Sequence, residues 1–243
     1  MKRKIILVCI CILALTIFSS AQSVVITKKA VTYKRPKPNS EYKHTFVVNY
    51  PKVKASTPSI SKLIEAAISY EKVFDMKLSE EMGEYQWLEV ADYEIGYNKN
   101  GILSISLFME GSAAYPDSSR RFVVIDTKTG KRVTPAAAFT NAIALLKMVI
   151  KAKDQEVAQA ISDLKKDPEN ADAPLDDMFR DSEQYNKVSL NEFSISDRGV
   201  TFHHNYGFAH VAKALEPNGE FMFTWAQLKP FIKSGGLLSR IAR

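Results

Sequence analysis

The chain has 243 residues, enough for one large domain or two small ones, and its 46% hydrophobic and 25% charged residues are those of an ordinary globular protein. The formal net charge of +6 reflects 33 Lys and Arg against 27 Asp and Glu, and three of the basic residues stand at positions 2–4. So small an excess excludes the strongly basic class of nucleic-acid-binding proteins.

The first 21 residues are typical of a cleavable signal peptide. A cationic start at residues 2–4 precedes an uncharged apolar run over residues 5–18, and residues 19–21, Ser-Ser-Ala, are small enough for cleavage. The run is shorter than the roughly 20 residues that a membrane-spanning helix needs. We therefore expect an exported protein, periplasmic or secreted, whose mature chain of residues 22–243 has no transmembrane helix.

Both cysteines, Cys9 and Cys11, lie inside the apolar run. Neither follows a small residue at the end of the run, as a lipid-modified cysteine would, so no lipid anchor is expected. Cleavage would leave a mature chain without disulfides, with 30 basic against 27 acidic residues and a net charge of +3. The stability of this chain must come from a hydrophobic core.

The mature chain begins with two predicted strands and a helix. Residues 24–50 are rich in β-branched and aromatic side chains with a break at residues 36–40, which indicates two strands, the second ending before Pro51. Thr57 is a good N-cap with Pro58 at the first helical position, and this predicts a helix that lies on the sheet. The apolar side of this helix would be formed by Ile60, Leu63, Ile64, Ala67, Ile68 and Phe74.

The clearest element is a β-hairpin. Apolar residues alternate with others over residues 91–97 and again over 103–109, and the turn Asn98-Lys99-Asn100-Gly101 joins the two runs. A loop is expected over residues 110–121, followed by a strand over residues 122–126.

The second half mixes helices and short strands. Thr134-Pro135 repeats the helix-start pattern, and Thr140 is expected to cap a longer helix that ends near Lys166. Further elements are predicted as a helix over 175–182, strands over 190–195, 200–206 and 220–224, and a helix over 225–233. Short turns join the strands and the helices come in blocks, so we predict an α+β fold with a mostly antiparallel sheet and helices packed on one face.

Motifs for catalysis or metal binding are weak throughout the chain. Residues 110–114, Glu-Gly-Ser-Ala-Ala, match half of a nucleophile elbow, and neither a phosphate loop nor a dinucleotide fingerprint occurs. His203 and His204 would point to opposite faces of a strand, and His210 has no cysteine or obvious carboxylate set nearby. We therefore predict neither a metal site nor a cofactor.

Paired carboxylates form the catalytic alternative. Glu110, Asp117 and Asp126 could meet in the fold and act as the acid and the nucleophile or base of an envelope glycan hydrolase. Asp126 also has a structural explanation, because a carboxylate at the entry to a Thr-Lys-Thr-Gly turn commonly accepts backbone hydrogen bonds.

Several segments resemble the RsiV-like domain family. Residues 110–116 are similar to a Gly-Gly-Ala-His-Pro-like loop of that family, residues 122–131 to its Asn-Phe-Asp-x-x-Thr-Gly-Lys strand and turn, and residues 193–202 to one of its closing strands. Residues 42–74 resemble the companion domain that precedes it. Two departures stand out: Ala114-Tyr115 replaces the loop histidine of the family, and residues 140–187 are enlarged.

This resemblance implies recognition without catalysis. The family includes the extracytoplasmic part of a lysozyme-sensing anti-sigma factor and the non-catalytic amino-terminal part of PdaC-type peptidoglycan deacetylases. By this likeness, residues 22–90 are a companion subdomain, residues 91–243 are the carboxyl-terminal subdomain, and the partner is a lysozyme-like enzyme or a cell-wall glycan.

The loops around residues 112–120 and 206–210 are expected to face this partner, because their aromatic and small residues offer flat contact area and hydrogen bonds. The candidate binding residues are Ser112, Tyr115, Arg120, Tyr206, Phe208 and His210.

Overall fold

The computed structural model describes residues 24–39, 43–170, 174–182 and 184–242. The predicted signal peptide lies outside the described residues and stays a prediction. Within these four ranges, no helix combines the length and the apolar character that crossing a bilayer requires.

Six strands form one sheet in the order β1-β2-β3-β4-β5-β6. Neighbouring strands are antiparallel except β2 and β3, which run parallel where Val47 and Val48 pair with β3. Asn100 and Gly101, both at positive φ, turn the chain from β3 into β4 and confirm the predicted hairpin. The strands are β1 Val25–Lys34, β2 Thr45–Lys54, β3 Leu88–Lys99, β4 Ile102–Ser112, β5 Pro116–Asp126 and β6 Lys131–Arg132.

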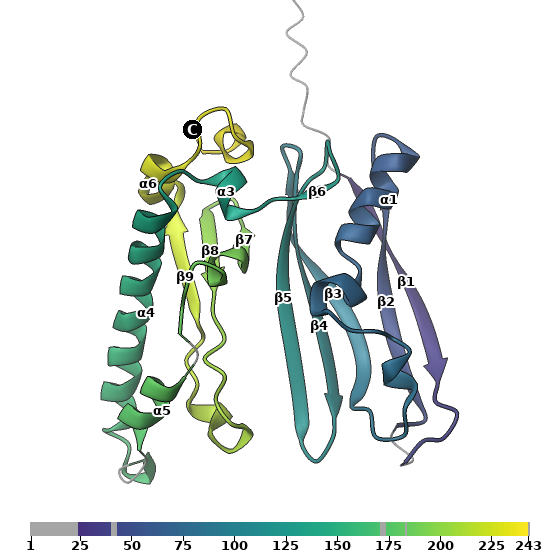
Figure 1. Ribbon diagram of the computed structural model, residues 1–243, viewed down its shortest axis with the longest axis horizontal. Coiled ribbons are helices and arrows are strands. Elements are labelled where there is room, and N and C mark those ends of the chain that lie inside the picture. The colour runs from purple at the N-terminus through teal and green to yellow at the C-terminus, as the bar shows by residue number, and fades with distance from the viewer. Residues whose placement is uncertain (1–23, 40–42, 171–173, 183, 243) are drawn as a thin grey trace, which may run out of the picture.

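A second sheet has three antiparallel strands in the order β7-β8-β9. These strands are β7 Phe193–Ile195, β8 Gly199–His203 and β9 Glu220–Thr224. Figure 1 shows the layers: helix α1, the large sheet, the small sheet and the long helix α4. The predicted α+β class is confirmed, and each sheet carries helices on one face.

A threonine or asparagine side chain caps the start of α1, α3, α4 and α6. The hydroxyl groups of Thr57 and Thr134 accept hydrogen bonds from backbone N–H groups three residues later, as predicted for α1 and α3. The cap of α4 is Asn141, one residue after the predicted Thr140. The α-helices are α1 Pro58–Ala67, α2 Tyr70–Phe74, α3 Pro135–Ala138, α4 Ala142–Leu164, α5 Leu175–Asp181 and α6 Trp225–Leu228. Short 3-10 turns are η2 Glu80–Met82, η3 Pro168–Asn170, η4 Ser189–Asn191, η5 His210–Leu215, η6 Lys229–Phe231 and η7 Leu237–Arg240.

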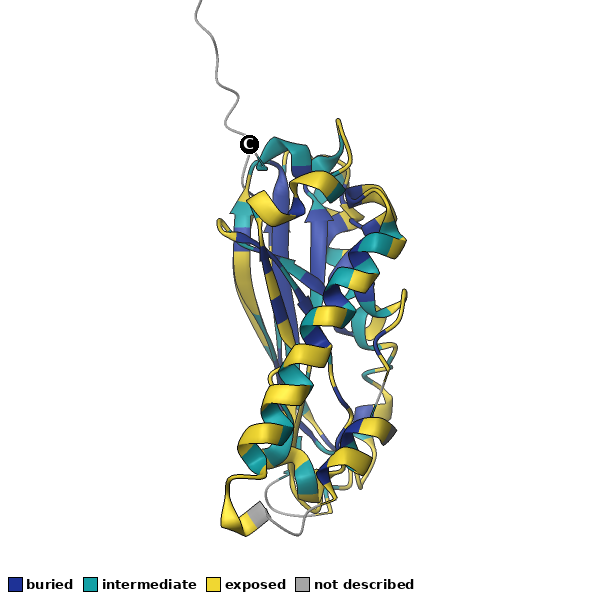
Figure 2. Cartoon of the chain, turned by 90° about the vertical axis from the view of Figure 1, so that its left-hand side faces the viewer, coloured by how far each residue is buried: buried dark blue, intermediate teal, exposed yellow. Residues whose placement is uncertain are grey.

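Three apolar clusters stabilise these layers. The first packs α1 and α2 against the outer face of the large sheet, and the second joins the inner face of that sheet to the small sheet and α4. A small third cluster of Phe179, Tyr206 and Phe208 lies against the later turns of α4. Figure 2 shows the outer side of α4 exposed, with buried strands behind it. The enlarged region of residues 140–187 thus covers the small sheet.

Two predicted boundaries in the first half were wrong. Strand β2 continues through Pro51 to Lys54, because β3 pairs with β2 only at Val47 and Val48 and the missing N–H of Pro51 therefore faces no strand. The predicted apolar side of the first helix is also interrupted: α1 ends at Ala67, Phe74 belongs to α2, and Leu63 is half exposed.

The predicted loop over residues 110–121 was wrong as well. These residues are the last three of β4 and the first half of β5, joined by a tip at residues 113–115. They lack an apolar alternation because most of them are exposed on this part of the sheet. β8 ends at His203, earlier than the predicted residue 206.

The two ends of the described chain lie at the same end of the molecule. Figure 1 places the start of β1 and the carboxyl-terminal segment at the top of the molecule, and the tip between β4 and β5 at the bottom. The proposed subdomain boundary at residue 90 falls within β3, which pairs with strands on both sides of it. This division stays a prediction.

Candidate functional site

Three adjoining cavities form a groove where the two sheets diverge. The β4 cavity, about 400 Å³, lies between Ser104, Ser106 and the small sheet, and the β5 cavity, about 320 Å³, between β5 and the loop after β8. They share Arg120, Phe122, His203 and Glu220. The tip cavity, about 480 Å³, includes Ser112 and His210 and shares Ser118 and Lys213 with the β5 cavity. We call the three together the inter-sheet groove.

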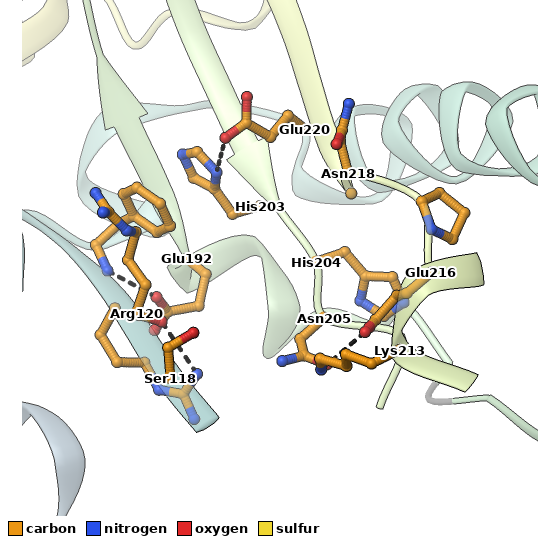
Figure 3. Close-up of a pocket in the computed structure, with 14 residues that line it drawn as sticks. Ser118, Arg120, Glu192, His203, His204, Asn205, Lys213, Glu216, Asn218 and Glu220 are labelled. Atoms are coloured by element: carbon orange, nitrogen blue, oxygen red, sulfur yellow. Dashed lines mark hydrogen bonds and ion pairs between the residues drawn. The ribbon is translucent and has the colours of Figure 1, made fainter. Parts of the chain in front are cut away.

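Arg120 lies at the centre of the groove. Its guanidinium is 4.7 Å from the centroid of the Phe108 ring, donates to Ser106 Oγ at 3.1 Å and forms an ion pair with Glu94. Strand β5 supports it, because Arg120 pairs with Phe108 in the register of β4 and β5. Figure 3 places Arg120 and Ser118 on one side of the β5 cavity and Asn205, Lys213 and Glu216 across from them.

His203 forms a wall between the β4 and β5 cavities. Its ring stacks on Phe122 with centroids 3.4 Å apart, and Nε2 is 2.8 Å from Ser194 Oγ. Nδ1 is 3.8 Å from a carboxylate oxygen of Glu220. Burial, followed by the positive charge of Arg120, lowers the pKa of His203 to about 3. The imidazole is therefore neutral at ordinary pH and serves as a polar, stacked surface.

Two glutamates organise the loops around the groove. Glu192 accepts from the backbone N–H of Phe122 at 3.0 Å and lies 3.7 Å from Arg132. Glu216 accepts from the backbone N–H of Tyr206 at 2.8 Å and pairs with Lys213 at 2.8 Å. These carboxylates hold the two walls of the β5 cavity in place.

An aromatic pair stands at the far end of the groove. The Tyr115 and His210 rings stack with centroids 4.5 Å apart, and His210 Nε2 is 3.2 Å from the carbonyl oxygen of Pro116. Tyr115 is 60% exposed, so most of its ring is open to a partner. Exposed, pre-positioned aromatic surface of this kind is typical of binding sites.

The structure gathers four of the six candidate residues. Ser112, Tyr115 and His210 lie at the tip cavity and Arg120 at the centre of the groove. All four are on strands, the β4–β5 tip or η5.

Tyr206 and Phe208 lie elsewhere. Their side chains are 0% and 9% exposed and pack with Phe179, and the Tyr206 hydroxyl donates to Glu156 at 2.8 Å. Burial followed by that carboxylate raises the pKa of Tyr206. These two residues therefore shape the loop before η5 and offer little contact area themselves.

The three candidate carboxylates do not converge. Glu110 and Asp117 line the tip cavity. Asp126 lies nine residues farther along β5, which corresponds to about 30 Å. Its carboxylate accepts from the Lys128 N–H and the Thr129 hydroxyl of the following turn, as its structural explanation predicts. Across the residues that the structure covers, no three His, Cys, Asp or Glu side chains are placed to share a metal ion.

The groove is acidic although the chain is basic. Its three cavities contain seven carboxylate side chains and three cationic ones, a formal charge of −4. The rest of residues 22–243 then has 27 basic against 20 acidic residues, a charge of +7. The acidic members are Glu89, Glu94, Glu110, Asp117, Glu192, Glu216 and Glu220, and the basic members are Arg120, Arg121 and Lys213.

Sequence reasoning missed five of these carboxylates. Glu192, Glu216 and Glu220 reach the groove only because the small sheet packs on the large one, and Glu89 and Glu94 only through the pairing of β3 with β4. No local pattern marks them. A long-range prediction of the sheet packing would have been the only signal.

Comparisons with known proteins identify the fold. No family model matches the chain, and no curated protein matches it. A DUF3298 family protein from Pseudomonas aeruginosa is similar at 14% identity, covering 88% of this chain and 96% of the other, with a TM-score of 0.50. A DUF3298 member from Bacteroides fragilis is similar at 16% identity, covering 90% and 98%, with a TM-score of 0.52. The chain therefore shares its fold with these two structural neighbours of the DUF3298 family.

Proposed function

We propose that the chain is an exported, non-enzymatic binding domain of the cell envelope that recognises a cationic lysozyme-like enzyme in its inter-sheet groove. The observation that carries this proposal is the charge of the groove, −4 within a mature chain of +3. A cleft lined by one sign of charge focuses the field and raises the association rate of oppositely charged partners.

The sign of this charge favours one of the two expected partners. Soluble peptidoglycan carries carboxylates on its muramic acid and peptide stems, and these would meet Glu110, Asp117 and Glu220 at the rim of the groove. Like charges placed together at an interface oppose association. A basic enzyme brings the opposite charge and is therefore the better match.

The tip supplies the apolar part of the contact. Tyr115 offers an exposed ring that His210 already holds in a stacked position. A rigid aromatic side chain loses little conformational entropy on binding, and such residues often carry much of the binding free energy. The tip is thus expected to form the centre of the interface, with the carboxylates around it.

Titration of the mature chain with a cationic lysozyme tests the proposal. We expect binding that weakens as salt is raised from 50 to 300 mM, because exposed charges are screened. The double variant Glu110→Gln, Asp117→Asn should bind more weakly and with a smaller salt dependence. Glu71→Gln, on α2 at the opposite face of the large sheet, removes one charge outside the groove and serves as the matched control for each of the two single variants, Glu110→Gln and Asp117→Asn.

Three outcomes would contradict the proposal. Absence of lysozyme binding at high micromolar concentration would exclude this partner. Tighter binding of soluble peptidoglycan fragments than of lysozyme would favour the glycan instead. Release of reducing ends from peptidoglycan, lost in Glu110→Gln, would establish the glycan hydrolase alternative.

A further inference from the structure

One edge of β5 has no partner strand beside the groove. Strand β4 pairs with β5 along its whole length, from Pro116 to Asp126. On the other side, β6 pairs only with Ile125 and Asp126. The edge of residues 116–122 therefore faces the β5 cavity instead of a strand.

The direction of the backbone groups on this edge follows from their contacts. In an antiparallel strand, alternate residues direct both N–H and C=O to the same side. Three such groups point away from β4: the Pro116 carbonyl reaches His210, the Phe122 N–H reaches Glu192, and the Val124 carbonyl accepts from Val133. Ser118 and Arg120 share this parity, so their N–H and C=O groups also point away from β4.

Of the four outward N–H and C=O groups of Ser118 and Arg120, two have a partner and two are open. The Ser118 N–H is bonded by the neighbouring Asp117 carboxylate, and the Arg120 carbonyl accepts a long 3.4 Å contact from the Arg121 side chain. Within the described part of the chain, no group bonds the Ser118 carbonyl or the Arg120 N–H. An acceptor and a donor two residues apart are what an incoming antiparallel strand requires.

Side chains close the edge on both sides of this opening. At the upper end, Glu192 and Arg132 bond the N–H and C=O of Phe122. At the lower end, His210 contacts the Pro116 carbonyl from an exposed position on η5, where a ligand can displace it. Side chains that bond the backbone groups of an edge strand protect it from non-specific pairing with other strands. The opening at Ser118 and Arg120 is left at the point where the groove contains the β5 cavity.

We propose that an extended, Lys- or Arg-bearing segment of the cationic partner adds to the edge of β5 as a short antiparallel strand. This inference rests on the proposed function, because the acidic side chains around the cavity select the charge of the segment. Main-chain hydrogen bonds to Ser118 and Arg120 would fix its register. Its alternate side chains would then meet Glu220 on the facing wall and Asp117 near the tip.

Comparison of Arg120→Pro with Arg120→Ala tests this mode of binding. Both variants lose the guanidinium, and only the proline variant also loses the N–H. That N–H points away from β4, so proline removes no hydrogen bond of the sheet. We expect Arg120→Pro to bind the cationic lysozyme about tenfold more weakly than Arg120→Ala. Equal thermal unfolding midpoints of the two variants would show that the difference arises in binding.

Amide hydrogen exchange of the wild-type chain gives a second measure. The Arg120 N–H should exchange slowly in the lysozyme complex and fast in the free chain, whereas the Ser119 N–H, directed toward β4, should be protected in both. Equal affinities of the two variants, with an Arg120 N–H that stays unprotected in the complex, would overturn strand addition while leaving the proposed function intact. A chain that does not bind lysozyme would overturn both. Dimers of the free chain that Arg120→Pro abolishes would assign the edge to a second copy instead.

Discussion

At the scale of single residues, His203 shows how the groove combines polarity with an apolar environment. Its ring stacks on Phe122 and contacts Ser194, and its side chain is only 10% exposed. A proton on this ring would be poorly solvated and would lie near the positive charge of Arg120, which explains the lowered pKa of about 3.

Acid should therefore destabilise the protein through His203. The pKa is about 3 in the folded chain and near 6.5 in an unfolded one, so between these values only the unfolded chain binds the proton. The contribution to stability is complete above pH 6.5 and declines as pH falls, by at most about 1.4 kcal/mol per pH unit. Urea unfolding at pH 7, 6, 5 and 4 should give a steeper loss of unfolding free energy for the wild type than for His203→Gln. Parallel pH dependences would contradict this assignment.

Individual site residues could be predicted only in part, and the contrast between Tyr115 and Tyr206 shows why. Both follow polar or small residues near the end of an element, and both have the same side chain. Tyr115 lies on the β4–β5 tip, where it stacks with His210 and stays 60% exposed, whereas α4 and α5 bury Tyr206 against Phe179. Which aromatic ring is exposed depends on a helix distant in sequence, and the local pattern does not contain that information.

At the scale of elements, Gly111 marks an irregularity that shapes the tip cavity. The pairing of β3 and β4 shifts between Leu88 and Val90, and the Trp87 carbonyl there accepts from the Ser112 N–H. A Cβ atom on Gly111 would lie 1.9 Å from that carbonyl oxygen. Only glycine allows β3 to approach β4 so closely.

Alanine scanning of two strand glycines should therefore separate steric from conformational effects. Gly111→Ala should lower the unfolding free energy by about 1–3 kcal/mol, because backbone must move to accept the methyl group. Gly96→Ala, whose added Cβ would meet its nearest neighbour at 3.8 Å, should be neutral or stabilise by about 0.5 kcal/mol. Thermal or urea unfolding measures both. Similar losses in the two variants would show that crowding at Gly111 is not the cause.

The elements themselves were predictable where local chemistry specifies them. The Asn100-Gly101 turn and the Thr-Pro helix starts fix the backbone within a few residues, and the structure has the hairpin, α1 and α3 at those positions. The last three residues of β4 and the first half of β5 were not predicted, because neither face of β5 is buried over residues 116–120 and its side chains follow no apolar period. The groove is formed from this segment, so the site was the least predictable part of the fold.

At the scale of the whole molecule, the two sheets share one core. The cluster between them contains Tyr97, Ile102 and Val124 of the large sheet and Phe193, Val200 and Phe202 of the small sheet. A buried hydrogen bond from the Ile195 N–H to Ser104 Oγ, 3.0 Å long, also joins β7 to β4. Loss of either sheet would expose this surface, so the two should unfold together.

The two tryptophans allow a direct test of this cooperativity. Trp87 packs against the cluster beneath α1, and Trp225 against the cluster between the sheets. Urea unfolding followed by fluorescence of Trp87→Phe and of Trp225→Phe should give midpoints that coincide with the far-UV circular dichroism of each variant. Ser104→Ala should lower both midpoints equally. A fluorescence midpoint that differs from the circular-dichroism midpoint of the same variant would indicate two separately folding units.

The positions of the two chain ends determine the orientation in which the protein can be coupled to a carrier or a surface. Both described ends lie at the top of the molecule, far from the tip between β4 and β5 (Figure 1). A carrier protein, a bead or a sensor surface coupled at either end would hold the groove outward and leave its entrance accessible. Under the proposed function, the domain is suited to serve as an oriented capture reagent, coupled through a terminus with the inter-sheet groove left accessible.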